Sequence, residues 1–445
     1  MATPLFTVEI GLASATDFFT LDLTQLSPAT APAVDAPLGD DQGYAWTDVT
    51  DYVLEGLTFR RGATRSQGPF WRYEAGSASI ELDNVDGRFD PLNLSSGPYV
   101  SGGLSEIRPN LPVRISAVVD GTTETMWVGV VDSVDLDYTS VTWSTVKLSC
   151  VDGVAWLQAA DLPELTTAVG AGDTVAARIT RILDRVGWPA AQRDLDPITA
   201  NTLQASTLAA SAWADILLAA DSDAGYVWFD RQGRLVYRTC GAIPATPSLT
   251  FSSSSSTAGK DFTAVTITRD VQQVYNSVSL ARKDGTAVSV EDVDAQAVIG
   301  QVRGYSRSDL ICQTDDNVAD VAQWIIGINA DLITRVEEVV VEPPADTTLL
   351  GTDEWWELLR LEMGAVVRVV HATPDGRDVD VEAVVRGLEW SAGVRAFSLK
   401  VSLQTQNPAY ELFVLDDTVR GVLAGTDGAT TYDGKQLGLV SVRSA

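Results

Sequence analysis

The sequence contains one histidine, His371, and three cysteines, Cys150, Cys240 and Cys312. The cysteines are widely spaced and form no CxxC pair, so they indicate neither a disulfide framework nor a zinc site. A serine triad would depend entirely on His371, and no GxSxG motif accompanies it. The sequence also has no Walker loop and no dinucleotide-binding fingerprint. We therefore expect no enzyme, and no catalytic, cofactor-binding or metal-binding residues.

Basic residues are scarce, because 31 Lys and Arg stand against 60 Asp and Glu, a formal net charge of −29. This excess of carboxylates disfavours binding to DNA, RNA or an anionic membrane, and it serves solubility equally well. No apolar run approaches the roughly 20 residues that span a bilayer. Residues 1–11 lack the basic region, apolar stretch and cleavage site of a secretory signal. We expect synthesis in the cytoplasm.

The chain has 445 residues, of which 45% are hydrophobic, and is long enough for about three domains. Most of it reads as β-structure, with short runs rich in Val, Ile, Thr, Tyr and Trp between turns. Asp-Gly pairs at positions 120, 284 and 375 predict hairpin turns. Cys150 ends a strand-like run and is expected to be a buried free thiol. The predicted strands include 111–119, 126–136, 141–151, 262–268 and 276–281.

Helical periodicity is confined to residues 173–186, 207–220 and 316–332. In the first of these segments, Asp173 or Thr174 is a suitable N-cap, and Gly187 ends the helix. Between the second helix and residue 248 lies a predicted hairpin that turns at Gln232-Gly233. The first two helices and this hairpin predict a small α/β module over residues 161–246.

Three segments differ in composition from the rest of the chain. Residues 25–44 are rich in Pro, Ala and Asp, without periodicity, and look like an insertion. The serine run Ser252–Ser256 is a flexible hinge by composition. Residues from 407 onward are rich in Gly and Asp, and we interpret them as an arm that becomes ordered against a partner.

A weak internal repeat predicts two β modules of one design within the chain. Both copies consist of a Val-Arg strand, an Asp-Gly turn, a glycine-containing strand and a returning strand. The first copy comprises Pro112–Ile115, Asp120-Gly121, Val128–Val130 and Val146–Leu148, and the second Val366–Val369, Asp375-Gly376, Arg386–Leu388 and Phe397–Val401.

One charge pattern suggests a site. Asp378, Asp380 and Glu382 alternate with small apolar residues, and the period of two in a strand places the three acids on one face. A solvated outer face is the ordinary explanation of such an acidic stripe. In a ring-shaped assembly, the same stripe could line the bore. The acidic segment 83–90 lacks the ligand spacing of a calcium loop, and an Asp-Gly turn after the strand 78–82 explains it better.

Residues 80–84 form the end of a predicted strand and run into the motif Asn-x-Asp-Gly-Arg-Phe-Asp-Pro at residues 84–91. A Gly-Pro-Tyr turn at 97–99 and the Pro-Val-Arg-Ile strand at 112–115 follow. This arrangement resembles minor tail proteins of actinobacteriophage-type siphophages, and through them the central baseplate hub of phage tails. Weaker matches follow in the expected order at Val227–Leu235, Val274–Val278 and Leu415–Leu423.

The resemblance implies a mainly β fold with α+β parts and a hub-like architecture. Each subunit of a trimeric ring would contribute two tube-like β-barrel domains, and six similar barrels could mate with a hexameric tail tube or distal tail ring. The implied division is a first barrel over 1–160 with the Pro-rich insertion 25–44, the α/β module over 161–246, a second barrel over 247–407 with a helical insertion near 316–332, and a C-terminal arm over 408–445.

The resemblance also implies a function and a location in the virion. A hub at the tail tip would cap the tail tube, contact the tape-measure protein and other tail-tip proteins, and leave a path for DNA ejection without specific DNA binding. Neither a wall hydrolase nor a fibre domain follows the hub region, so those activities are expected on other chains.

Two other functions remain open from the sequence. One is a tail-associated hydrolase, because carboxylate pairs such as glycosidases use are plentiful, although no pair is singled out. The other is a carbohydrate-binding adhesin, for which the 12 Trp would supply stacking platforms. Trp127, Trp143, Trp213 and Trp228 lie in apolar-patterned elements, which favours packing in the core.

Overall fold

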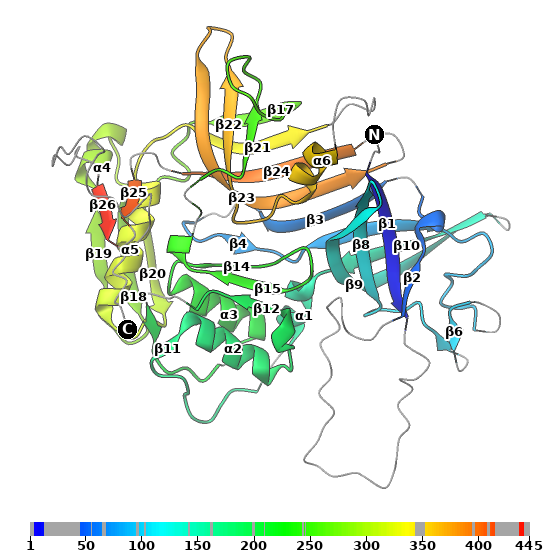
Figure 1. Cartoon of the computed structure of the whole chain (residues 1–445). Coiled ribbons are helices and arrows are strands. Elements are labelled where there is room, and N and C mark those ends of the chain that lie inside the picture. Colours follow the sequence, from blue (N-terminus) through cyan, green and yellow to red (C-terminus); the bar gives the residue numbers. More distant parts are fainter. Residues whose placement is uncertain are drawn as a thin grey trace.

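A large, strongly curved sheet forms the body of the protein in the computed structural model (Figure 1). Fourteen of the described strands belong to this sheet. The expected mainly β class with α+β parts is therefore confirmed. The structure describes residues 4–12, 45–54, 56–64, 68–94, 98–101, 104–140, 143–160, 163–197, 201–208, 210–242, 244, 246–342, 352–393, 397–406, 410–413 and 436–439, so the insertion 25–44 and most of the arm 408–445 lie outside it.

The N-terminal part of the chain supplies one half of the sheet, which we call the first β module. Strand β5 shows the alternation of buried with half-buried or exposed residues that arises when one face of a sheet packs on the core. The strands are β1 (Leu5–Leu12), β2 (Ala45–Asp48), β3 (Leu57–Thr64), β5 (Ser77–Asp83), β8 (Pro112–Val119), β9 (Thr122–Ser140) and β10 (Trp143–Val151), with the short strands β4 (Arg72–Tyr73), β6 (Val100–Ser101) and β7 (Leu104–Ser105) beside them.

The second β module supplies the other half of the sheet. Its strands are β16 (Leu249–Ser252), β17 (Ala264–Thr268), β21 (Arg335–Val341), β22 (Val366–Ala372), β23 (Asp378–Ala392) and β24 (Phe397–Thr405). Helix α6 (Thr352–Leu359) lies between β21 and β22 in the chain and buries Trp355 and Trp356 in the core. A single hydrophobic core extends through both modules.

The two modules repeat one strand order. In the first, neighbouring strands run β3-β5-β10-β9-β8-β1, and in the second β17-β21-β24-β23-β22-β16. Equivalent strands also follow one another in the same order along the chain. The one difference in direction among these pairs is that β1 lies antiparallel to β8, whereas β16 lies parallel to β22. The internal repeat is therefore a duplicated six-strand unit.

The strand registers correct one part of the predicted repeat. Val113 lies opposite Gly129 in the first module. Its equivalent in the second module, Val367, lies opposite Ala383 and not opposite Gly387. The sequence prediction thus wrongly matched the two glycine-containing segments. A glycine that occurs in both strands does not determine the register in which each strand pairs. The outer strands of the repeat were matched correctly.

The modules join where β3 runs antiparallel to the second half of β23, from Leu57 opposite Ala392 to Gly62 opposite Gly387. The rings of Phe59 and Trp390 stack across this junction with centroids 6.4 Å apart. Both side chains are almost completely buried. Since aromatic pairs favour such offset stacking, the junction is a packed interface as well as a hydrogen-bonded ladder.

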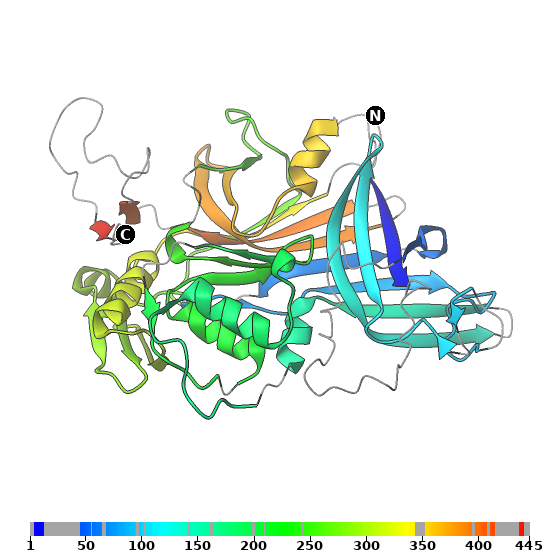
Figure 2. The same cartoon turned by 60° about the horizontal axis from the view of Figure 1, so that its bottom comes forward.

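A smaller α/β module covers part of this sheet (Figure 2), with α2 and α3 on the far side of the strands β14 and β15. Its elements are α1 (Gly153–Ala159), β11 (Asp173–Thr174), α2 (Val175–Arg185), β12 (Arg193–Leu195), β13 (Thr202–Leu203), α3 (Ala212–Asp221), β14 (Tyr226–Phe229) and β15 (Leu235–Arg238). Helix α2 and the predicted hairpin are confirmed, and Thr174 caps α2 through Ala177 N–H. Helix α3 begins at Ala212 and not near residue 207, because Leu208 is left-handed (φ 49°) and Ser211 is the N-cap.

Arg386 of β23 attaches the α/β module to the large sheet. Its guanidinium carbon lies 3.8 Å from the centre of the Tyr226 ring, and its Nε donates to Gln404 Oε1 at 2.8 Å. The side chain is almost completely buried. Aromatic faces and amide oxygens are suitable partners for a buried guanidinium, which otherwise costs free energy when it leaves water.

A third unit is inserted in the second β module between β17 and β21. The predicted helix 316–332 is confirmed as α5, and the Asp284-Gly285 hairpin joins β18 to β19. The unit contains more than the expected helix, with the elements β18 (Ser277–Arg282), β19 (Val288–Glu291), α4 (Val293–Ile299), β20 (Gly304–Leu310) and α5 (Asp315–Asn329), and the described part of the C-terminal arm adds β25 (Tyr410–Phe413) and β26 (Gln436–Leu439).

One expectation about an individual side chain is wrong. Trp143 is 49% exposed, whereas Trp127, Trp213 and Trp228 are buried as expected. Trp143 is the first residue of β10 and lies opposite Ser140 at the end of β9, beyond the part of the sheet that the core covers. The apolar pattern of this strand therefore extends past the core. Cys150 is a buried free thiol, as predicted.

The serine run is also not a free hinge. Ser252 belongs to β16, and the Ser253 hydroxyl accepts from Ala372 N–H at 3.1 Å and bonds Nδ1 of His371 at 3.0 Å. Serine hydroxyls can satisfy neighbouring backbone and side-chain groups, which composition alone does not reveal. The run lies against the hairpin of β22 and β23.

Asp152 at the start of α1 predicts a pH dependence of stability. Its carboxylate caps the helix through Val154 N–H at 3.0 Å, yet burial raises its pKa from 3.8 to about 7. Between these values the folded protein binds a proton that the unfolded chain has released, so this stabilisation is complete below about pH 4 and is lost as the pH rises through 7.

Asp152→Asn keeps the cap and should flatten the pH profile of the free energy of unfolding between pH 4 and 8. Asp294→Asn, an exposed control, should leave the profile unchanged, and urea titrations at several pH values measure both; an equally steep profile for Asp152→Asn would contradict the prediction.

Candidate functional site

The acidic stripe Asp378, Asp380 and Glu382 lies in the first half of β23. All three residues are exposed, whereas Val379 and Val381 between them are half-buried. The period of two in a strand places the carboxylates side by side on the outward face of the β22–β23 hairpin.

The structure adds a basic partner that the sequence interpretation missed. Arg368 of β22 lies opposite Glu382, and its Nε donates to Asp380 Oδ1 at 2.8 Å while its second nitrogen lies 2.5 Å from Oδ2. The hydrogen bond from Arg368 holds the pKa of Asp380 below its usual value. Arg368 stood in the Val-Arg motif of the repeat, and the Asp375-Gly376 hairpin implied that it would face the stripe.

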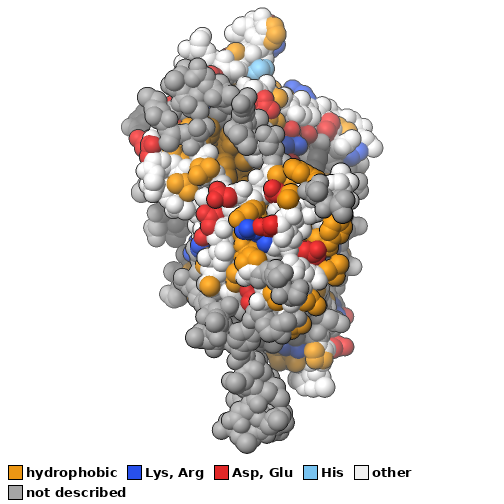
Figure 3. All heavy atoms as spheres, turned by 90° about the vertical axis from the view of Figure 1, so that its right-hand side faces the viewer, with side chains coloured by type: hydrophobic (Ala, Val, Ile, Leu, Met, Phe, Trp, Pro, Cys, Tyr) orange, Lys and Arg blue, Asp and Glu red, His pale blue; other side chains and the backbone are white. Residues whose placement is uncertain are grey.

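Asp378 is held from the other side by the serine run. The hydroxyls of Ser254 and Ser256 donate to its Oδ2 at 3.0 and 3.2 Å. The stripe is therefore fixed at two of its three positions and carries a formal charge of −2 when Arg368 is included. Acidic side chains elsewhere are scattered among hydrophobic and uncharged ones on the face shown in Figure 3.

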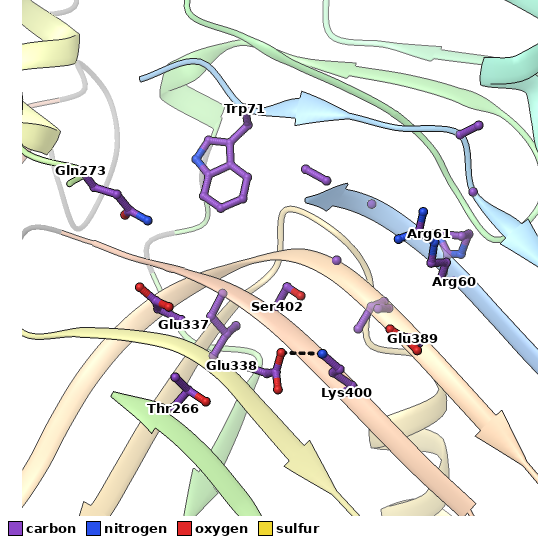
Figure 4. Close-up of a pocket in the computed structure, with 17 residues that line it drawn as sticks. Arg60, Arg61, Trp71, Thr266, Gln273, Glu337, Glu338, Glu389, Lys400 and Ser402 are labelled. Atoms are coloured by element: carbon purple, nitrogen blue, oxygen red, sulfur yellow. Dashed lines mark ion pairs between the residues drawn. The ribbon is translucent and has the colours of Figure 1, made fainter. Parts of the chain in front are cut away.

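A cavity of about 340 Å³ lies where β3, β23, β24 and β21 adjoin. Figure 4 shows charged side chains of both signs around it, with Lys400 and Glu338 paired at 2.8 Å. Arg61 reaches Glu362 at 2.7 Å, and Arg60 lies 3.6 Å from Glu74. In each of these three pairs a basic side chain lies next to an acidic one, so their charges offset each other. The cavity is thus a feature of the junction between the β modules.

Among the described residues, His371 bonds Ser253 through Nδ1 and packs near the ring of Phe262, with centroids 5.9 Å apart. In a serine triad a carboxylate orients the histidine. Asp378, which lies opposite Ala372 in the neighbouring pair, bonds the serines Ser254 and Ser256. These contacts attach His371 to the serine run and to Phe262.

The loop 84–91, which carries most of the sequence resemblance, packs its Phe89 side chain into the hydrophobic core. Gly87 has φ 71° and turns the chain, and Asn84 Oδ1 accepts from Phe89 N–H at 2.8 Å. The Phe89 ring is fully buried and stacks on Tyr99 with centroids 5.4 Å apart. Asp86 pairs with Arg88 in the Asp-Gly turn that the sequence predicted.

Comparison with solved structures gives likenesses that cover most of the chain. The chain is similar to the tail protein from Neisseria meningitidis MC58, with a TM-score of 0.53 and 13% identity, covering 91% of this chain and 97% of that one. It is also similar to the 43 kDa tail protein of prophage MuSo2 from Shewanella oneidensis, with a TM-score of 0.50 and 14% identity, covering 81% and 94%. The chain has the fold of a phage tail protein. The resemblance noted in the sequence is thereby confirmed at the level of fold.

The tail-protein fold spans nearly the whole chain, and it contains both β modules. No family model and no curated protein matches the sequence. In the part of the chain that the structure describes, no helix is long and apolar enough to cross a membrane. The same residues contain no group of three or more His, Cys, Asp or Glu side chains that could hold a metal ion.

Proposed function

We propose that the protein is a structural component of a phage tail tip, in which three copies form a baseplate hub that caps the tail tube. The duplicated strand order carries this proposal. A chain with two equivalent modules presents six of them in a trimer, and six modules can match a tube with sixfold symmetry. The two likenesses to tail proteins support the same location in the virion.

In this proposal residues 1–160 and 247–407 form two tube-like barrel domains around the bore, and residues 161–246 lie at the periphery. The distal tail or tail-tube protein would contact one end of the ring, and the tape-measure protein and other tail-tip proteins the other. The arm 408–445 would become ordered against such a partner. The role is mechanical, without enzymatic activity, and a zymogram of the purified chain on peptidoglycan or polysaccharide should show no clearing.

Counting the copies tests the proposal. Native mass measurement of the purified full chain should give three times the 47.5 kDa subunit mass, and a symmetry-resolved image of the tail tip should show six similar densities around the axis. A single copy at the tail tip, or a ring with one barrel per chain, would contradict the hub.

The acidic stripe would keep DNA moving through the bore. A negative wall repels phosphates and forms no ion pairs that would arrest the DNA. Changing Asp378, Asp380 and Glu382 to Lys should slow DNA ejection about tenfold or more at low salt, with less effect at high salt, while particles still assemble. Single-particle ejection assays over a salt series measure this.

A control variant separates this effect from a change of net charge. Glu291, Asp294 and Asp320 are exposed acids of the inserted third unit, and changing these three to Lys alters the net charge by the same amount. This control should eject DNA at the normal rate. Equal ejection rates for the stripe variant and the control would show that the stripe does not line the bore.

A further inference from the structure

Among the strand edges without a partner strand in the described chain are one edge of β17 and one edge of the second half of β9. Strand β17 pairs on one side with β21 and is the last strand of the sheet path. Strand β9 pairs with β8 only as far as Val130, so the other side of its second half, from Asp132 to Ser140, faces no described strand. Unpaired edges offer backbone donors and acceptors for another strand.

The duplicated fold relates these two edges to each other. In the first β module, the strand equivalent to β17 is β3. In the second β module, the strand equivalent to β9 is β23. Strands β3 and β23 pair with each other at the junction inside the chain. The two unpaired edges are therefore the two halves of a second, equivalent junction that one chain by itself leaves open.

The registers fix which residues correspond on the β17 side. Thr58 lies opposite Ser79, and Ser79 lies opposite Ser149. In the second module Thr266 lies opposite Glu338, which lies opposite Ser402. Leu148 and Val401 are equivalent residues of the repeat, so the residues that follow them, Ser149 and Ser402, are equivalent as well. Thr266 of the second module therefore occupies the place that Thr58 has in the first.

The correspondence on the β9 side follows in the same way. Leu148 lies opposite Val134, and Val401 lies opposite Leu388. Three residues further along each strand, Asp137 therefore occupies the place of Ser391. Thr58 lies opposite Ser391 in the internal junction.

We propose that β17 of one chain pairs antiparallel with the second half of β9 in a second copy of this chain, with Thr266 opposite Asp137. The inference rests on the proposed hub and names the contact that would close it. Each chain offers one edge of each kind, so the contact is head-to-tail, and such contacts generate a ring when the rotation closes. The large sheet would then continue from subunit to subunit.

Side chains at the two edges suit this register. Ile267 would face Leu136, in the place of the stacked pair Phe59 and Trp390, and both are half-buried apolar residues at the rim of the core. The next pair would bring Asp135 opposite Thr268 and beside the exposed Arg269. The internal junction likewise sets Glu389 opposite Arg60. Opposite charges across a strand pair are favourable.

A cross-linking experiment with the full chain tests the register. Opposed Cα atoms in an antiparallel pair lie about 4.5–5.5 Å apart, within the range of a disulfide. Thr266→Cys and Asp137→Cys change two exposed residues, and the double variant, oxidised or treated with a short bis-maleimide, should give covalent dimers and trimers on a denaturing gel. An equimolar mixture of the two single variants should give a covalent dimer.

Two controls define the specificity. Each single variant alone should stay at the monomer position, which also accounts for the native cysteines. Thr266→Cys combined with Ser133→Cys shifts one partner by four residues, about 13 Å along the strand, and should cross-link at least tenfold less. Equal cross-linking in both registers would overturn the inference.

The outcome is separable from that of the hub itself. A trimer by native mass measurement without specific cross-linking of Thr266→Cys to Asp137→Cys would overturn the edge pairing and leave the hub intact. A monomer without cross-links would overturn both. A trimer with the specific cross-link supports both.

Discussion

Replacing Phe89 with alanine is expected to lower the free energy of unfolding by about 3–5 kcal/mol, the range for removing a fully buried aromatic side chain. The Phe89 ring is fully buried, stacks on Tyr99, and meets the edge of the Tyr52 ring with centroids 5.5 Å apart. Its loss would leave a cavity beneath the loop 84–91. Asn84 N–H donates to the Ser144 carbonyl, and the Tyr138 hydroxyl donates to Asp90 Oδ2. Because the loop is tied to the first β module near both of its ends, it has little freedom to collapse into this space.

Val85→Ala is the matched control, since Val85 lies in the same loop and is 53% exposed. This change should alter the free energy of unfolding by less than about 0.5 kcal/mol. Urea titrations of both variants measure the difference. Similar small losses in the free energy of unfolding for Phe89→Ala and Val85→Ala would show that the loop does not contribute to the packing of the core.

Gly62→Ala is expected to weaken the junction of the two β modules. Gly62 has φ 119°, and a Cβ atom there would lie only 2.4 Å from the Arg386 carbonyl oxygen and from the Gly387 Cα, which is a steric overlap. The φ angle costs an alanine about 1–3 kcal/mol. Moving β23 away from β3 to relieve the overlap should cost about 1–3 kcal/mol more, the range for overpacking.

Gly56→Ala separates these two costs. Gly56 has a similar φ of 105°, but nothing lies within 4 Å of the position that its Cβ would take. This control should show the backbone cost alone. Thermal and urea unfolding of the two variants should therefore differ by the packing cost, and equal losses would mean that β3 and β23 can separate freely at this point.

Local chemistry explains why several turns and one helix could be predicted. Asp120, Gly121, Asp284 and Gly376 all adopt left-handed conformations in the predicted hairpins. Gly tolerates this region without strain, and Asp enters it more readily than most residues. These preferences act within a few residues, so a short stretch of sequence is sufficient to reveal them.

The candidate site was predicted only in part. The alternation of Asp378, Asp380 and Glu382 gave their common face, because a strand has a fixed period. The cation of Arg368 reaches the stripe from β22, 12 residues away in the chain. The hydroxyl of Ser254 reaches it from the segment after β16, 124 residues away. The serine content of that run predicted a hinge, because composition does not reveal which groups the hydroxyls will contact in the folded protein.

The sequence by itself determined the mainly β class, the hairpins, the helices α2 and α5, the Asp-Gly turn of the loop 84–91 and the existence of a repeat. These features depend on side-chain periodicity and turn preferences between near neighbours. Only the tertiary structure decided the pairing of β3 with β23, the true register of the repeat around Gly129, and the exposure of Trp143. Strand partners are chosen by packing between residues far apart in the chain, and this choice leaves no signal of fixed spacing.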